Sequence, residues 1–178
     1  NCVFDDNTST SPTAFAGGRG VGVSYLFVDN GQIVNCDFTN NTCSLGAGVY
    51  LVGSDADEPD ANDTYVYGCN FIGNTAQDGF GGTFTSLSAD YTVDNCVFED
   101  NTSGTGSGAA IYGQGNNRAI VVDSSVFRSN VGGNGALLVR DSATTATITN
   151  TLFEDNGDPL ITNIGAGLTI FGRSSAGS

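Results

Sequence analysis

The chain has 178 residues and carries 19 acidic side chains against five arginines, with neither lysine nor histidine, so its formal net charge is −14 at pH 7. This charge excludes a nucleic-acid partner, because binding a phosphate backbone requires clustered Lys and Arg. The sequence has no apolar run near the roughly 18 residues that a membrane-spanning helix needs, and its length is that of one domain, residues 1–178.

One motif recurs from end to end of the chain, and each copy has a phenylalanine as its anchor. The anchors are Phe4, Phe38, Phe71, Phe98, Phe127 and Phe153, so successive copies lie 34, 33, 27, 29 and 26 residues apart. Self-similarity at such an interval is the signature of a repeat protein. We therefore expect one structural coil per copy, which gives six coils.

Each copy places a small residue two positions before the anchor. This column consists of Cys2, Cys36, Cys69, Cys96, Ser125 and Thr151. Strand alternation puts it on the same inward face as the phenylalanine. A β-branched residue stands a further three positions back, and this odd offset requires a bend. The bend is expected at Asn35, Gly68, Asn95, Ser124 and Asn150, where Asn and Gly tolerate left-handed backbone angles.

An asparagine follows every anchor by three residues. This column consists of Asn7, Asn41, Asn74, Asn101, Asn130 and Asn156. An asparagine in a turn can bond local backbone, and stacked copies can also bond one another. The column predicts a ladder of amide side chains along the repeat.

In chain order, a turn insert at 8–20 precedes a strand at 21–28, and the second copy carries an additional cysteine, Cys43. Residues 53–63 form an acidic loop, coils three and four cover 65–87 and 91–113, and residues 113–118 form another turn. The abundance of Gly, Val, Thr and Asn disfavours helices, and no segment keeps a helical apolar stripe. These features predict a solenoid of parallel strands. At about 4.8 Å per coil, the rod would be roughly 29 Å long.

The paired motifs resemble a known repeat. FxxN occurs as FDDN, FTNN, FIGN, FEDN, FRSN and FEDN, and a second motif as GAGVY (46–50), GGTFT (81–85), GAAIY (108–112), GALLV (135–139) and GAGLT (165–169). Together they resemble the FxxN and GGA[ILV] motifs of polymorphic outer-membrane-protein repeats and of right-handed parallel β-helices in the pectin-lyase-like superfamily. The resemblance implies an all-β, right-handed parallel β-helix of about six coils. It implies little about function, since related coils serve adhesins, fibres and polysaccharide-cleaving enzymes.

The five cysteines allow two interpretations. Four of them lie in the inward column, where cysteine packs as a small hydrophobe and Ser or Thr of similar size can replace it. Stacked coils would also bring them within disulfide range, but free buried thiols are favoured, and an odd count leaves at least one unpaired. With no CxxC motif and no His, zinc is not expected.

Two further kinds of site are candidates. Asp55, Asp57, Glu58 and Asp60 could bind calcium in the acidic loop, although a plain solvated loop is the commoner explanation of such a stretch and no cofactor is otherwise expected. Four sequons mark glycosylation candidates, with Asn62 and Asn40 ahead of Asn7 and Asn101, which also belong to the amide column.

No catalytic constellation can be recognised, because neither Arg128 nor Arg140 joins an acidic cluster by spacing. The sequence therefore predicts an extracellular or cell-surface structural or adhesive rod that belongs to a longer repeat protein or filament, and no enzymatic role is expected. Its partners would be neighbouring coils or a second copy joined end to end, and surface glycans are the other candidate. The alternatives are a polysaccharide lyase, a glycosidase or a glycan-binding module, which an extended groove of aromatic and carboxylate residues would indicate.

Overall fold

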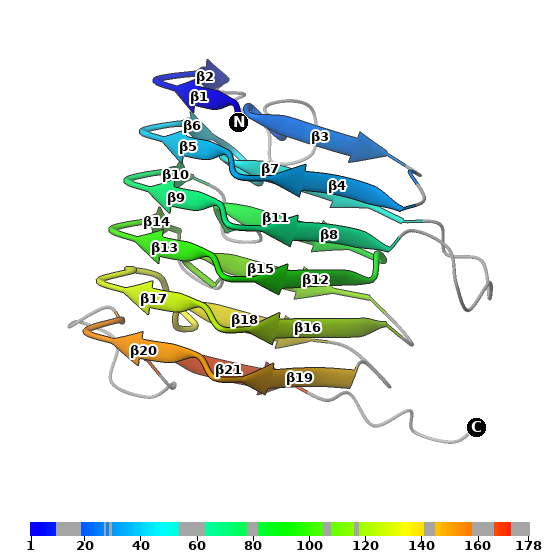
Figure 1. Ribbon diagram of the computed structural model, residues 1–178. Coiled ribbons are helices and arrows are strands. Elements are labelled where there is room, and N and C mark those ends of the chain that lie inside the picture. Colours follow the sequence, from blue (N-terminus) through cyan, green and yellow to red (C-terminus); the bar gives the residue numbers. More distant parts are fainter. Residues whose placement is uncertain are drawn as a thin grey trace, which may run out of the picture.

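The computed structural model describes residues 1–9, 19–26, 28, 30–53, 63–77, 82–104, 108–115, 118–140, 145–157 and 166–171. In this part of the chain every regular element is a short strand, and every strand pairing is parallel. The strands stack in register from coil to coil, so that equivalent residues of successive copies lie side by side (Figure 1). The expected solenoid is therefore confirmed.

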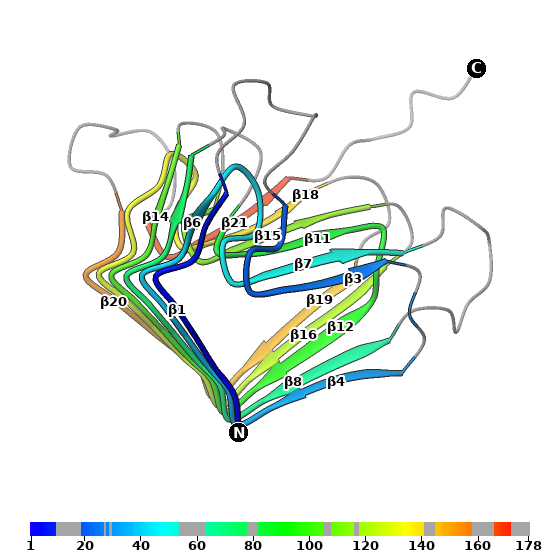
Figure 2. The same ribbon diagram turned by 90° about the horizontal axis from the view of Figure 1, so that it is seen from above.

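Four sheets run along the solenoid (Figure 2). Sheet 1 consists of β1 (Val3–Asp5), β5 (Asp37–Thr39), β9 (Asn70–Ile72), β13 (Val97–Glu99), β17 (Val126–Arg128) and β20 (Leu152–Glu154). Sheet 2 consists of β4 (Gly31–Val34), β8 (Thr64–Tyr67), β12 (Tyr91–Asp94), β16 (Ala119–Asp123) and β19 (Thr145–Thr149). Sheet 3 consists of β3 (Val23–Leu26), β7 (Val49–Val52), β11 (Phe84–Leu87), β15 (Ile111–Gln114), β18 (Leu137–Arg140) and β21 (Leu168–Phe171). Sheet 4 consists of β2 (Thr8–Ser9), β6 (Thr42–Cys43), β10 (Thr75–Ala76) and β14 (Thr102–Ser103).

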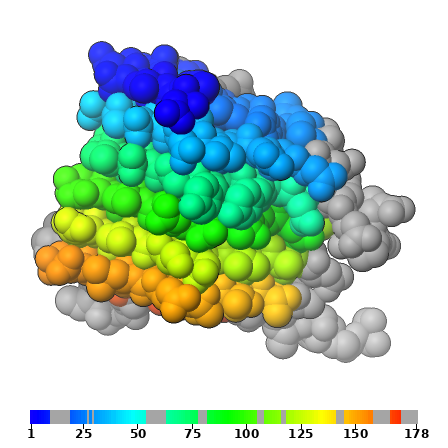
Figure 3. All heavy atoms as spheres, in the orientation of Figure 1, coloured from blue at the N-terminus to red at the C-terminus, as the bar shows by residue number. Residues whose placement is uncertain are grey.

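The coils form successive layers, which appear as colour bands in the space-filling view (Figure 3). The described boundaries differ slightly from the expected ones. The strand expected at 21–28 is described at Val23–Leu26, and β15 continues to Gln114 inside the predicted turn at 113–118. Within the described residues no helix is long and apolar enough to cross a membrane.

Two series of left-handed residues recur along the solenoid and turn the chain on either side of sheet 1. The predicted bends between sheets 2 and 1 have φ of 53° at Asn35, 62° at Gly68, 53° at Asn95, 48° at Ser124 and 48° at Asn150. A second series, which the sequence analysis did not anticipate, occupies the third position of FxxN. It consists of Asp6, Asn40, Gly73, Asp100, Ser129 and Asp155, with φ from 51° to 65°. Asp, Asn, Ser and Gly recur at this position because it also requires a positive φ.

The core is a set of side-chain columns along the solenoid. The phenylalanine rings stack with centroids 4.6–4.8 Å apart and planes within 10° of parallel, from Phe4 to Phe153. The four inner rings are fully buried, and burying each one stabilises the fold by roughly 1.5–3 kcal/mol. The β-branched column of sheet 2 packs against the same core.

The four inner strands of sheet 3, β7, β11, β15 and β18, are buried on both faces. Tyr50, Tyr112 and Leu138 point away from the core but are at most 1% exposed. The glycine-rich second motif lies against this outer face: a Cβ at Gly46 would lie 3.0 Å from the Tyr50 Cβ, and one at Gly108 would lie 3.0 Å from the Leu138 Cβ. This second layer explains why the outward side chains Tyr50, Tyr112 and Leu138 are large and buried.

Candidate functional site

The asparagine column forms a continuous hydrogen-bonded ladder. The Asn74 Nδ2 donates to the Phe38 carbonyl of the preceding coil at 2.8 Å and to the Asn101 Oδ1 of the following coil at 3.0 Å. The backbone N–H of Asn74 donates to the same Asn101 Oδ1. The pattern repeats from Asn7 to Asn156. Between neighbouring asparagines, the backbone N–H and Nδ2 donors always face the later coil, and the Oδ1 acceptors always face the earlier one. The ladder therefore has a direction, and in this sense it is polar.

The Cys, Ser and Thr column is a second ladder. The Cys69 Sγ donates to the Tyr67 carbonyl at 3.4 Å and accepts the Cys36 backbone N–H at 3.4 Å. The Ser125 hydroxyl makes the same two contacts, with the Asp123 carbonyl and the Cys96 N–H. Small size therefore explains only part of the preference for Cys, Ser and Thr at this position. Their thiol or hydroxyl group can also donate one hydrogen bond and accept another.

All five cysteines are free thiols, which agrees with the favoured interpretation and not with stacked disulfides. Cys2 is exposed, whereas the other four are buried, including Cys43 in β6. Burial raises the pKa of the Cys36 thiol. A raised pKa keeps this thiol protonated and weakly reactive at neutral pH.

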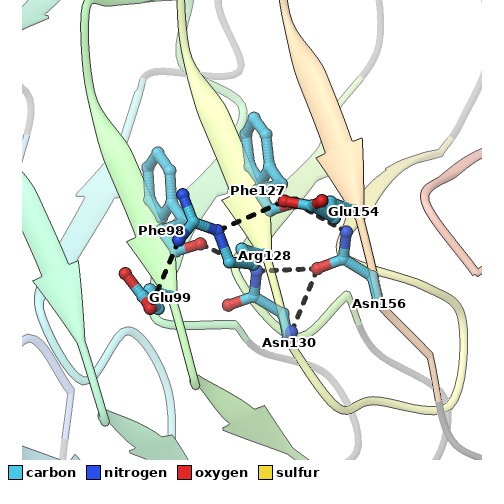
Figure 4. A network of polar contacts seen from close by, with 7 residues as sticks. All are labelled: Phe98, Glu99, Phe127, Arg128, Asn130, Glu154 and Asn156. Carbon is cyan, nitrogen blue, oxygen red and sulfur yellow. Dashed lines mark hydrogen bonds and ion pairs between the residues drawn. The ribbon is translucent and has the colours of Figure 1, made fainter.

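Arg128 connects three coils on the outside of sheet 1 (Figure 4). Its guanidinium lies between the carboxylates of Glu99 and Glu154, with N–O distances of 3.9 and 3.5 Å. The three residues are register partners on β13, β17 and β20. Sequence spacing alone indicated no acidic partner for Arg128, although all three residues directly follow an anchor phenylalanine. Such half-exposed pairs contribute little stability, at most about 1 kcal/mol.

The predicted calcium ligands and one of the predicted glycosylation sites lie in a part of the chain that the structure does not describe. Asp55, Asp57, Glu58, Asp60 and Asn62 all lie outside the described residues. Within the described ranges, no group of three or more His, Cys, Asp or Glu side chains is placed to hold a metal ion.

Three sequon asparagines are described, and their surroundings differ. Asn101 is fully buried, and its Nδ2 donates to the Phe71 carbonyl and to the Asn130 Oδ1. A glycan on this nitrogen would replace one of its two donated hydrogens and would have to occupy the closed interior, so the fold excludes Asn101 as an acceptor. Asn7 and Asn40 are exposed, and their side chains donate to Asn41 and to Asp5 respectively.

Asp5, which is exposed, and Asp123, which is half-buried, bridge neighbouring coils in the same way. The Asp123 Oδ1 accepts from the Thr149 hydroxyl at 2.6 Å and from the Asn150 Nδ2 at 3.0 Å. These two bonds hold the pKa of the Asp123 carboxyl below its ordinary value of 3.8. Asp5 has a lowered pKa for the same reason, since its Oδ1 accepts from Thr39 and Asn40.

The outer face of sheet 2 brings aromatic and carboxylate groups together. The ring centroids of Tyr65 and Tyr67 on β8 are 6.0 Å apart, and the Tyr65 hydroxyl donates to the Asp94 Oδ2 on β12 at 3.0 Å. A hollow of about 380 Å³ opens beside Tyr65. The alternation of Tyr65, Val66 and Tyr67 predicts two outward rings, but the diagonal contact of Tyr65 with Asp94 depends on side-chain geometry that the aligned columns do not specify.

The family comparison agrees with this architecture, since residues 1–177 match the family described as right handed beta helix region. The chain belongs to the right-handed β-helix family. The parallel sheets and the absence of helices from the described part of this β-helix agree with that assignment, which also gives the hand of the solenoid. The more specific polymorphic outer-membrane-protein type of repeat is not distinguished by this match. Comparison of the β-helix with curated proteins and with solved structures gave no match.

Proposed function

We propose that this β-helix is a structural and adhesive element of an extracellular or cell-surface rod or filament. The stacked coils would act as a stiff spacer, and the end coils would pair with further coils of a longer chain or of a second copy. The strong negative charge and the exposed sequon asparagines support an extracellular setting.

The observation that carries the proposal is the polarity of the asparagine ladder. Among the described residues, the Asn7 Oδ1 accepts no ladder bond, and the Asn156 backbone N–H donates none. The Asn7 Oδ1 and the Asn156 backbone N–H are complementary, because between inner coils the backbone N–H of each asparagine donates to the Oδ1 of the next asparagine. Joining the coil of Asn156 to the coil of Asn7 would therefore continue the ladder without a change of pattern.

Exposed apolar surface at the end coils supports the same pairing. The four most exposed large apolar side chains of the described residues are Val3, Leu26, Leu152 and Ile170, and all belong to the first or last coil. The edge strands β1 and β20 of sheet 1, and β3 and β21 of sheet 3, each have one neighbour. Unpaired parallel edges of this kind recruit further strands.

Sedimentation velocity over a range of concentrations tests the proposal with a matched pair of variants. Asn156→Asp replaces the amide that would face the next Asn7 by a carboxylate without a donor. The control Gln77→Glu makes the same amide-to-carboxylate change at an exposed position with no ladder role. We expect wild type and Gln77→Glu to form larger species as concentration rises, and Asn156→Asp to associate about tenfold more weakly.

Two results would overturn the proposal. One is a wild-type chain that stays single at every concentration, and the other is an Asn156→Asp variant that associates as strongly as wild type. Circular dichroism of each variant shows whether the coil of Asn156 remains folded.

A further inference from the structure

Tyr65 and Tyr67 form an exposed aromatic cluster on the outer face of sheet 2, on β8, which is the neighbour of the edge strand β4. The two side chains are 38% and 37% exposed, and their ring planes are inclined by 12°. The hydrogen bond to Asp94 fixes the Tyr65 ring, so less conformational entropy would be lost when a ligand packs on it.

The hollow beside Tyr65 adds polar groups to this aromatic cluster. It is lined by the amide residues Asn30 and Gln32, by Asp63, and by the hydroxyl residues Thr64 and Thr92. Its volume of about 380 Å³ falls in the range of small-molecule sites, roughly 300–1,000 Å³, and is too small to receive a folded protein.

The chemistry of the lining selects the class of ligand. Amide, hydroxyl and carboxylate groups can bond the hydroxyls of a sugar, and an aromatic ring face attracts the weakly positive C–H groups of a sugar ring. None of the described lining residues is positively charged, and the whole chain has a net charge of −14. A negatively charged ligand would therefore be repelled.

We propose that this face, formed by Tyr65, Tyr67, Asp94 and the adjoining hollow, binds an oligosaccharide that carries no negative charge. The two tyrosines lie on the side of the rod and outside the first and last coils, so this face would give the rod a lateral binding function whether or not the coils associate. One end of the sugar chain lies in the hollow and the next ring packs on the tyrosines.

Titration of the whole chain with uncharged hexasaccharides tests the proposal. The probes are cellohexaose, xylohexaose, mannohexaose and N-acetylchitohexaose, and calorimetry is combined with tyrosine fluorescence, which is unobscured because the chain has no Trp. We expect saturable binding of at least one probe and an affinity about tenfold lower in Tyr67→Ala. Ile72→Ala is the matched control, because Ile72 is also 37% exposed but lies on sheet 1, and its affinity should not change.

Tyr65→Phe and Tyr65→Ala separate the ring from its hydroxyl, and the first variant should bind better than the second. Three outcomes would overturn the proposal. They are no binding of any of these probes at millimolar concentration, unchanged affinity in both Tyr65→Ala and Tyr67→Ala, or equally tight binding of hexagalacturonate, which is anionic.

Discussion

At the scale of single residues, Asn101 shows what the amide ladder contributes. Its amide accepts the Asn74 N–H and donates to the Phe71 carbonyl, and all of these groups lie in the interior. Asn101→Ala would leave buried backbone groups without partners, so we expect the free energy of unfolding in urea to fall by about 3 kcal/mol.

Asn7→Ala is the control for this measurement. Asn7 occupies the same column but is exposed, so water can replace its bonds, and we expect a loss below about 1 kcal/mol. Equal losses at the two positions would show that the asparagines act locally and that the buried ladder adds nothing.

The Asp123 carboxyl makes stability depend on pH. Its pKa is lowered in the folded chain by the Thr149 and Asn150 hydrogen bonds, so its contribution is fully present above the unfolded value of 3.8. That contribution is lost as the pH falls through the lower, folded pKa. NMR titration should show the Asp123 pKa rising toward 3.8 in Thr149→Val, with the Asp5 pKa unchanged as an internal control. An unchanged Asp123 pKa would contradict the assigned cause.

At the scale of the structural element, the bend between sheets 2 and 1 depends on a left-handed residue. Asn95 has a φ of 53°, which a β-branched residue adopts only at a cost. We expect Asn95→Val to lower the free energy of unfolding by about 2 kcal/mol, and Asn95→Gly to change it by less than about 0.5 kcal/mol. Similar effects of the two substitutions in urea unfolding would contradict the backbone explanation.

The repeating elements could be predicted because one residue type recurs in each column. The recurring phenylalanine, asparagine and small residues predicted the coil, its inward face and the first bend. The second left-handed position was missed because Asp6, Asp100 and Asp155 look like ordinary solvent-facing acids, and only their φ values show why they recur.

Contacts between coils were harder to anticipate. Residues that meet across coils, such as Tyr65 and Asp94, are separated by 29 positions, and linkers of unequal length hide their register. Arg128 and its two glutamates share the position directly after an aligned phenylalanine, but that position varies between copies, so the sequence predicts only solvent-facing side chains there. The burial of both faces of sheet 3 also depends on how the glycine-rich segment folds back, which no local pattern specifies.

At the scale of the whole molecule, one polar ladder runs through all six coils and ends in complementary groups. The phenylalanine stack and the parallel edges follow the same axis, so every main column could extend across a junction between chains. Growth along this axis adds parallel strands, whereas the acidic sides of the rods repel one another.

Cryo-electron microscopy of the concentrated wild-type chain tests this central claim most directly. The account predicts filaments in which chains stack end to end with a repeat of roughly 29 Å, six coils at about 4.8 Å each, and with Asn156 of one chain next to Asn7 of the following chain. Isolated rods, or rods joined through their sides, would contradict it.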